Sequence, residues 1–179
     1  MFGQRNVYLI GPMGSGKTAV GRRLATLLSK HFFDSDAEIE KRTGVDIRYI
    51  FEKEGETRFR EREREVIADL TALDGVVVAT GGGVILDAKN RARLTETGTV
   101  VYLETNVETL VRRTKASKTR PLLLNDDPRS VLERMMLIRR PLYEGTADLR
   151  IETTGRQVRA VAADIQQRLA QRVAKPAST

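Results

Sequence analysis

The sequence predicts an α/β fold in three layers, α/β/α, around a central parallel sheet of about five strands. The first reason is that short β-branched runs alternate with helical patterns along the chain. The second is a glycine-rich pattern that joins the first strand to the first helix. The third is size, because 179 residues with 40% hydrophobic content suit one domain over residues 1–179.

The first half of the chain begins with an apolar strand at 6–10 and a helix at 16–29. A short strand at 32–34 follows, and helical patterns continue from there through residue 73. Because parallel strands need long crossover connections, we expect these helices to cover the faces of the sheet.

The second half repeats this alternation. Two β-branched runs, with the segment 87–96 between them, predict strands at 75–79 and 99–103. Further patterns predict helices at 107–114 and 129–139, a strand at 149–152, a helix at 157–172 and a frayed tail at 175–179. Ligands of such folds bind at the carboxyl ends of the strands, where the motifs described next are located.

Residues 11–18 read GPMGSGKT, a full match to the phosphate-loop pattern G-x-x-x-x-G-K-[ST]. Gly11, Gly14 and Gly16 allow backbone conformations in which successive N–H groups point at phosphate oxygens. Lys17 adds a positive charge, the Thr18 hydroxyl suits Mg²⁺, and the N-terminus of the following helix favours an anion. The motif therefore predicts a nucleoside triphosphate as the ligand.

Two carboxylates follow the second strand in the segment FDSD, residues 33–36. Either Asp34 or Asp36 could orient or deprotonate an acceptor hydroxyl, while the other holds Mg²⁺-bound water. A structural interpretation stays open beside this one, in which Ser35 caps the next helix and Glu38 completes a capping box. The two interpretations are compatible.

The run ETRFREREREV at 56–66 alternates basic and acidic residues, and most of these charges should be solvated. On a helix, Glu56 would pair with Arg60 and Glu61 with Arg64. Composition alone does not distinguish one arginine of the run from another.

Three consecutive glycines, Gly81, Gly82 and Gly83, follow Thr80 at the end of the strand at 75–79. Such a run is costly unless a ligand or another backbone approaches closely, although a loose turn is the simpler alternative. Their N–H groups could bind a carboxylate or a hydroxyl. Because this strand lacks a terminal acidic residue, Mg²⁺ would rely on Thr18 and the Asp34/Asp36 pair.

The formal net charge is +7, and the whole basic excess lies in residues 106–179, which hold 15 basic and 8 acidic residues. Its densest part, 112–120, contains little aromatic surface on which nucleic-acid bases could stack. We therefore expect a small polyanionic substrate and no nucleic-acid partner, with a merely solvated basic face as the alternative.

The chain contains no cysteine, which excludes a disulfide framework and cysteine catalysis and fits a reducing compartment. No apolar run approaches the ~20 residues of a membrane span, and the N-terminus lacks the features of a secretory signal. We expect a cytoplasmic protein without a membrane partner. The single histidine, His31, is expected to be structural.

The order of the motifs GPMGSGKT, FDSD, FRERE, TGGG, TRPLL and RRPLY resembles that of the shikimate kinase family, small P-loop kinases, over nearly the entire chain. That family transfers the γ-phosphoryl group of ATP to the 3-hydroxyl of shikimate, in the pathway to chorismate and the aromatic amino acids. The resemblance implies ATP and shikimate as substrates and Mg²⁺ as cofactor, and we expect a monomer.

The resemblance also implies site residues. The phosphates of ATP would be wrapped by Gly14, Ser15, Gly16, Lys17, Thr18 and Ala19, and Mg²⁺ would be held by Thr18 and, through water, by Asp34. Shikimate would be bound within a helical region at about 36–64 and beyond it, by Asp36, Phe51, Phe59, Arg60, Glu63, Gly81, Gly82, Gly83 and Arg139. Planar guanidinium groups suit this task, because they can bind a carboxylate bidentately.

The resemblance further implies a lid at about 115–125, in which Arg120 would close over the γ-phosphate and oppose the charge of the transition state. Lys17, Asp36 and Arg120 would then be the catalytic residues. Arg113 and Arg156 match positions that flank the adenine of ATP.

Two other functions stay open at the level of the sequence. A related kinase could phosphorylate another small hydroxylated acceptor, such as gluconate or a nucleoside monophosphate. A non-catalytic module could bind nucleotide or nucleic acid with steep salt dependence and turn nothing over.

Overall fold

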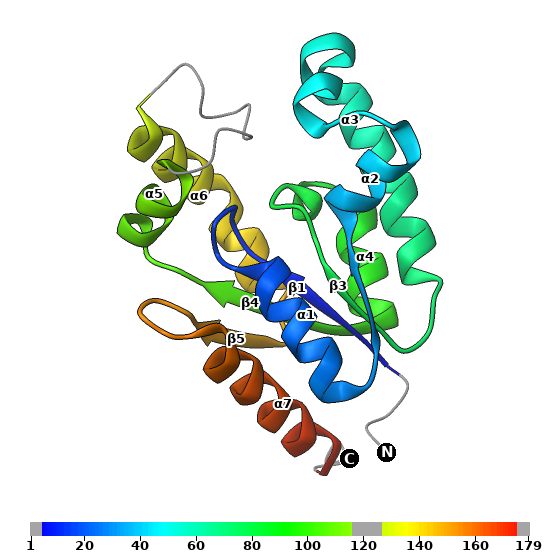
Figure 1. Ribbon diagram of the computed structural model, residues 1–179, viewed down its shortest axis with the longest axis vertical. Coiled ribbons are helices and arrows are strands. Elements are labelled where there is room, and N and C mark those ends of the chain that lie inside the picture. The colour runs from blue at the N-terminus through cyan, green and yellow to red at the C-terminus, as the bar shows by residue number, and fades with distance from the viewer. Residues whose placement is uncertain (1–4, 116–126, 175–179) are drawn as a thin grey trace.

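A computed structural model of the protein describes residues 5–115 and 127–174. Its centre is a five-stranded, fully parallel sheet with the strand order β2-β3-β1-β4-β5 (Figure 1). The strands are β1 (Asn6–Ile10), β2 (His31–Asp34), β3 (Val76–Ala79), β4 (Gly98–Glu104) and β5 (Leu149–Glu152). The predicted fold class and parallel sheet are confirmed.

Helices connect the strands and form the two outer layers. In chain order they are α1 (Lys17–Leu28), α2 (Ser35–Thr43), α3 (Ile47–Thr71), the 3₁₀ turn η1 (Val84–Leu86), α4 (Ala88–Thr97), α5 (Val107–Lys115), α6 (Pro128–Thr146) and α7 (Val158–Ala174). Within the described ranges no helix is sufficiently long and apolar to cross a membrane.

Side chains alternate between the two faces of the sheet and so build two cores. One core joins Val7 and Leu9 of β1 to α1 and α7. The other joins Tyr8 and Ile10 of β1 to α3, α4 and α6. Figure 1 shows these two helical layers on opposite sides of the sheet. The central strand β1 is buried along its whole length because both of its faces are covered.

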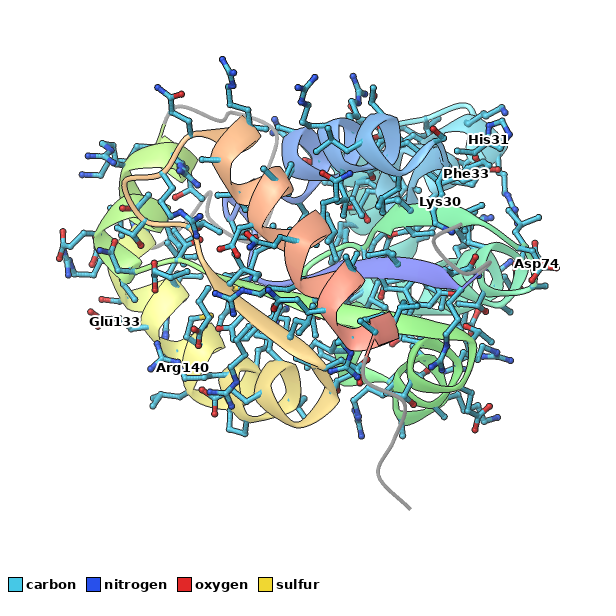
Figure 2. All side chains as sticks on the ribbon, turned by 90° about the horizontal axis from the view of Figure 1, so that it is seen from below. Lys30, His31, Phe33, Asp74, Glu133 and Arg140 are labelled. Atoms are coloured by element: carbon cyan, nitrogen blue, oxygen red, sulfur yellow. The ribbon has the colours of Figure 1, made fainter. Side chains whose placement is uncertain are left out.

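Charged side chains lie over the outer faces of the helices, as Figure 2 shows for Glu133 and Arg140, both exposed on α6. His31 is also exposed, at the start of the edge strand β2.

Three loops leave the sheet at the same edge because all strands run parallel. The phosphate loop follows β1, the Asp34–Asp36 segment follows β2, and the glycine run follows β3. In the strand register, Ala79 of β3 pairs with Leu9 of β1 on one side and with Asp34 of β2 on the other. The fold thereby brings together three motifs that are far apart in the sequence.

The helical stretch expected through residue 73 is divided into α2 and α3. Gly44 ends α2 with φ 73° and ψ 9°, and the Asp46 side chain caps α3 by accepting from the Tyr49 N–H. Inside α3, Gly55 adopts φ 83° and ψ 170°, which kinks the helix. Hydrophobic periodicity carries no signal for such a kink, because Gly55 acts through its backbone alone.

The prediction that a helix ends at residue 139 is wrong, since α6 continues through Pro141 to Thr146. A proline removes one backbone hydrogen bond, which is why the sequence favoured an earlier end. The helix persists because its last turns bury Thr146 and also Tyr143, which packs against Tyr102 of the sheet.

Candidate active site

The phosphate loop has the backbone geometry that its glycines permit. Gly11, Gly14 and Gly16 all have positive φ values of 149°, 82° and 91°. Gly16 is the N-cap of α1, so the unpaired N–H groups of that helix open onto the loop. The loop therefore combines oriented amides with the positive end of a helix dipole.

Lys17 is the first residue of α1, and its side chain, at 9% exposure, reaches back to the start of this loop. Its Nζ donates to the Gly11 carbonyl at 2.7 Å and to the Pro12 carbonyl at 2.8 Å. The side chain thus closes the loop on itself and holds a positive charge where phosphate oxygens would lie.

Thr18 and Asp34 meet at the mouth of the loop, where the Thr18 hydroxyl donates to Asp34 Oδ2 at 2.6 Å. A hydroxyl and a carboxylate in contact beside a phosphate loop fit Mg²⁺, which takes few protein ligands and completes its shell with water and phosphate oxygens. Among the described residues no group of three or more acidic or histidine side chains is arranged as a complete metal site. The pair would thus hold the ion only together with the nucleotide.

The capping interpretation of Ser35 is wrong. Asp34 is the N-cap of α2, since its Oδ1 accepts from the N–H groups of Asp36 and Ala37 at 3.0 and 3.1 Å. Ser35 is fully buried, and its Oγ instead accepts from the Gly81 N–H at 2.8 Å. The carboxylate of Asp34 is the better cap because it accepts two N–H bonds.

Asp36 and Glu63 both approach Gly81 on the side where other residues carry a Cβ. A Cβ placed on Gly81 would lie 2.6 Å from Asp36 Oδ1 and 3.1 Å from Glu63 Oε2. Both oxygens are buried and have no hydrogen-bond partner within the described chain. Burial, with help from Asp34, raises the pKa of Asp36 to about 6, against the opposing charges of Lys17 and Arg60. Burial likewise raises the pKa of Glu63 to about 7, against the neighbouring Arg60.

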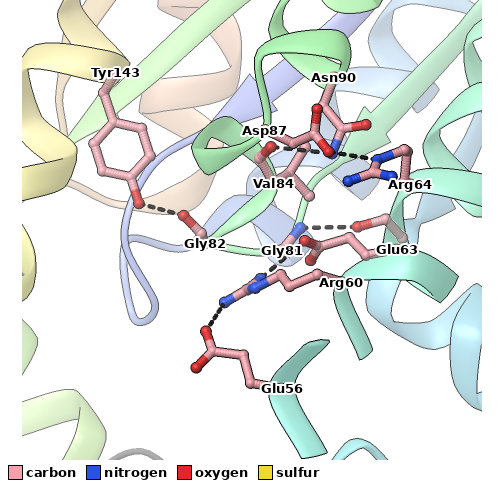
Figure 3. Close-up of polar contacts among 11 residues, drawn as sticks. Glu56, Arg60, Glu63, Arg64, Gly81, Gly82, Val84, Asp87, Asn90 and Tyr143 are labelled. Carbon is pink, nitrogen blue, oxygen red and sulfur yellow. Dashed lines mark hydrogen bonds and ion pairs between the residues drawn. The ribbon is translucent and has the colours of Figure 1, made fainter. Parts of the chain in front are cut away.

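Arg60 extends from α3 toward the glycine run (Figure 3). Its Nη1 donates to Glu63 at 2.9 Å and its Nη2 to Glu56 at 3.3 Å, so the predicted pair with Glu56 is confirmed. A Cβ on Gly83 would lie 2.3 Å from Arg60 Nη1. Any larger residue at this position would displace the guanidinium from the loop.

The other predicted pair on this helix, Glu61 with Arg64, is wrong. Glu61 pairs with Arg58 at 2.6 Å, and Arg64 pairs with Asp87 at 2.5 Å. Arg64 thereby joins α3 to the N-cap of α4, a long-range contact that spacing within one helix cannot predict.

Arg139 reaches the glycine run from the opposite side, on α6, and is 7% exposed. A Cβ on Gly82 would lie 3.5 Å from its Nη1. Phe51 and Phe59 form an apolar wall, with ring centroids 4.6 Å apart. These three side chains and Arg60 line one cavity of about 860 Å³, which is also lined by the phosphate loop.

A family model described as shikimate kinase matches residues 13–170 of the chain. The chain belongs to the shikimate kinase family. A shikimate kinase of Pseudoalteromonas atlantica is 51% identical over 168 residues, 94% of this chain and 98% of that relative. One of Shewanella sp. (strain MR-4) is 50% identical over 166 residues, 93% of this chain and 97% of the relative. A solved structure, shikimate kinase from Acinetobacter baumannii in complex with shikimate, aligns with a TM-score of 0.94 and 48% identity, covering 96% of each chain.

The predicted family is thus confirmed, and as a member of the shikimate kinase family the chain is an ATP-dependent kinase. The cavity that unites the phosphate loop with the two arginines is its candidate active site. The part played by each residue remains a prediction.

Fewer N–H groups of the glycine run are available to bind a substrate than the sequence suggests. The Gly81 N–H is taken by Ser35, and the Gly81 carbonyl accepts from the Val84 N–H. Among the hydrogen bonds of the described residues, the N–H groups of Gly82 and Gly83 are not used. The N–H groups of Gly82 and Gly83 are therefore the ones that could bind a ligand.

Arg113 donates to the Gly14 carbonyl at 2.8 Å, and Arg156 donates to the Glu152 carbonyl and to Asp164. Both line the cavity near the phosphate loop. Their expected contact with adenine stays a prediction. Arg120 and most of the expected lid lie outside the described residues.

Ser35 and Tyr143 both hydrogen-bond to the backbone of the glycine run, and reasoning from the sequence does not find either contact. The sequence suggests a cap at Ser35 and indicates no contact for Tyr143, whose hydroxyl donates to the Gly82 carbonyl at 2.6 Å. The only signal for Tyr143 was its place in the RRPLY motif, four residues after Arg139 and so on the same helix face.

Proposed function

We propose that the protein transfers the γ-phosphoryl group of ATP to the 3-hydroxyl of shikimate. The observation that carries this proposal is the convergence of the phosphate loop, the carboxyl groups of Asp36 and Glu63, and two arginines on a single cavity. The close structural relative described as a complex with shikimate supports the choice of acceptor.

On the nucleotide side, the loop amides and Lys17 would bind the phosphates, and Thr18 and Asp34 would hold Mg²⁺. The ion neutralises charge on the β- and γ-phosphates when it is bound. The hydrogen bond between Thr18 and Asp34 supports this assignment, because it keeps the two side chains together at the mouth of the loop. Preorganised charge of this kind is the main contribution a protein makes to phosphoryl transfer.

On the acceptor side, Arg60 and Arg139 would bind the carboxylate of shikimate, with Phe51 and Phe59 against its ring. Two guanidinium groups on opposite sides of the glycine run suit a planar carboxylate. Glu63 would steady Arg60 through their 2.9 Å ion pair. A neutral acceptor would leave both arginines without a shared anion.

Asp36 would accept the proton of the attacking hydroxyl. The new bond forms between the hydroxyl oxygen and the γ-phosphorus, the bond from the γ-phosphorus to the β–γ bridging oxygen breaks, and ADP leaves. The pKa of Asp36, raised by burial to about 6, leaves most of the carboxyl ionised at neutral pH and able to take a proton. Arg120 would neutralise the transferring group from the lid, and Arg113 and Arg156 would lie along the nucleotide.

The testing experiment is a coupled assay of ADP release with shikimate, with gluconate, with a nucleoside monophosphate and without an acceptor. We expect turnover only with shikimate and Mg²⁺. Release with another acceptor would keep the nucleotide site but change the substrate, and no release would favour a binding module.

We also infer that the enzyme is monomeric and cytoplasmic. The absence of cysteine from the sequence supports the location, because it fits a reducing compartment.

A further inference from the structure

Tyr143 is a buried tyrosine whose hydroxyl reaches the candidate site. Its side chain lies within the core at 0% exposure, on the face of α6 that packs against the sheet. The ring stacks on Tyr102 of β4, with centroids 5.1 Å apart and planes inclined by 20°. The hydroxyl donates to the Gly82 carbonyl at 2.6 Å (Figure 3). The core therefore fixes the ring, and the ring fixes one point of the glycine run.

Gly82 is the place where three parts of the site meet. A Cβ on this glycine would lie 3.5 Å from Arg139 Nη1, 3.3 Å from the backbone nitrogen of Met13 and 3.6 Å from the Gly11 carbonyl. The first belongs to α6, and the other two belong to the phosphate loop. A displacement of Gly82 would therefore alter the spacing between the acceptor arginine and the phosphate loop.

The electrostatics keep the Tyr143 hydroxyl a donor. Burial raises its pKa above the ordinary value, while the charge of Arg139 and a hydrogen bond with it act in the opposite direction. A protonated phenol can donate one hydrogen bond and accept another. The hydroxyl donates to the Gly82 carbonyl, and Arg139, four residues earlier on α6, is close enough to act on it.

We propose that the Tyr143 hydroxyl is a positioning group for the acceptor site, which sets the distance between Arg139 and the glycine run so that both can hold one carboxylate. This inference rests on the proposed function, because it concerns how shikimate is held. Tyr143 would not touch the substrate. It would act by keeping Arg139 and the Gly82 N–H in the arrangement that binding requires, which lowers the entropy lost when the acceptor is bound.

The test is Tyr143→Phe, which removes the hydroxyl and keeps the stacked ring. Tyr102→Phe is the matched control, because Tyr102 belongs to the same stacked pair and its hydroxyl forms no hydrogen bond with another described residue. KM for shikimate, KM for ATP and kcat are measured for both variants and the wild type. We expect KM for shikimate to rise about three- to tenfold in Tyr143→Phe, the effect of losing one hydrogen bond. KM for ATP and kcat should change less than about twofold, and Tyr102→Phe should resemble the wild type.

Three outcomes would overturn the inference alone. The first is an unchanged KM for shikimate in Tyr143→Phe. The second is a loss shared by shikimate and ATP, and the third is a failure to fold, since either of these would assign the hydroxyl to the fold and not to the acceptor site. A wild-type protein that does not turn over shikimate would instead refute the proposed function, and this inference with it, before any variant is compared.

Discussion

Arg58 and Arg60 lie two residues apart on α3 and differ in what surrounds them. Arg58 has a side chain that is 50% exposed and pairs with Glu61, whereas Arg60 is 21% exposed and reaches Glu63. The sequence run gives both the same appearance. The two residues differ because they lie on different faces of α3. Only the tertiary structure determines which face is turned toward the glycine run.

Arg60→Ala should raise KM for shikimate about 10- to 100-fold, because the carboxylate of bound shikimate loses a charge-assisted hydrogen-bond partner. KM for ATP should stay near the wild-type value. Steady-state kinetics with each substrate varied in turn would measure both constants, and Arg58→Ala is the matched control, with no expected effect. Equal constants for the wild type and Arg60→Ala would remove Arg60 from the acceptor site.

Glu63 gives the protein a pH dependence that can be measured. The pKa of Glu63 in the folded protein, raised by burial to about 7, lies above its ordinary value of 4.5. Between these values the folded state binds more protons than the unfolded chain, so the free energy of unfolding falls as pH rises. Above the folded pKa the loss should be on the order of 3 kcal/mol.

Glu63→Gln removes this titration and keeps the volume of the side chain. Urea unfolding of the wild type and the variant at about pH 5 and about pH 8 would compare their slopes. We expect the wild type to lose more stability than the variant across this interval. Parallel pH profiles would contradict the raised pKa.

At the scale of elements, the phosphate loop depends on one side chain for its closure. Lys17→Ala removes both the positive charge and the donor to the Gly11 and Pro12 carbonyls. kcat should fall by about 10² to 10³ or more, because the variant loses electrostatic stabilisation of the transferring group. The ADP-release assay measures this fall, and Lys41→Ala, at an exposed position of α2, serves as the control. A Lys17→Ala enzyme with near-native kcat would rule out the loop assignment.

The kink of α3 is a second element-scale feature. Gly55 separates the turn that carries Phe51 from the turn that carries Phe59 and Arg60. Its φ and ψ of 83° and 170° are almost inaccessible to other residues, so Gly55→Ala should destabilise the protein by about 1 to 3 kcal/mol. We also expect KM for shikimate to rise as the two phenylalanines separate.

Thermal unfolding and kinetics would test this expectation beside Gly145→Ala, a glycine of α6 with no positive φ and open space around it. That control should be neutral or slightly stabilising, since alanine favours a helix. A Gly55→Ala variant as stable as the control would mean that the kink is not constrained.

The sequence predicted most elements because their signals are local. Strand β1, the phosphate loop and α1 follow from an apolar run and a motif, and the structure has them at nearly the expected residues. The end of α6 and the kink of α3 were not predictable in this way. In the first case tertiary burial of Tyr143 outweighs the proline, and in the second a single glycine changes direction without altering the hydrophobic pattern.

At the scale of the whole molecule, the parallel sheet explains why the site is where it is. Segments after β1, β2 and β3 meet at one edge, so residues separated by more than 60 positions, such as Thr18 and Gly81, line the same cavity. The position of the site at this edge followed from the predicted topology. The contacts at this edge did not follow from it, because the hydrogen bond that the Gly81 N–H donates to Ser35 and the burial of Glu63 both depend on how the layers pack.

The most direct measurement of the central claim is ³¹P NMR of the product formed from ATP, Mg²⁺ and shikimate. The account predicts that the γ-phosphate signal of ATP disappears while a new phosphomonoester signal grows, with its phosphorus coupled to the proton on carbon 3 of shikimate. A phosphate on another hydroxyl, inorganic phosphate alone, or unchanged ATP would contradict the transfer proposed for this site.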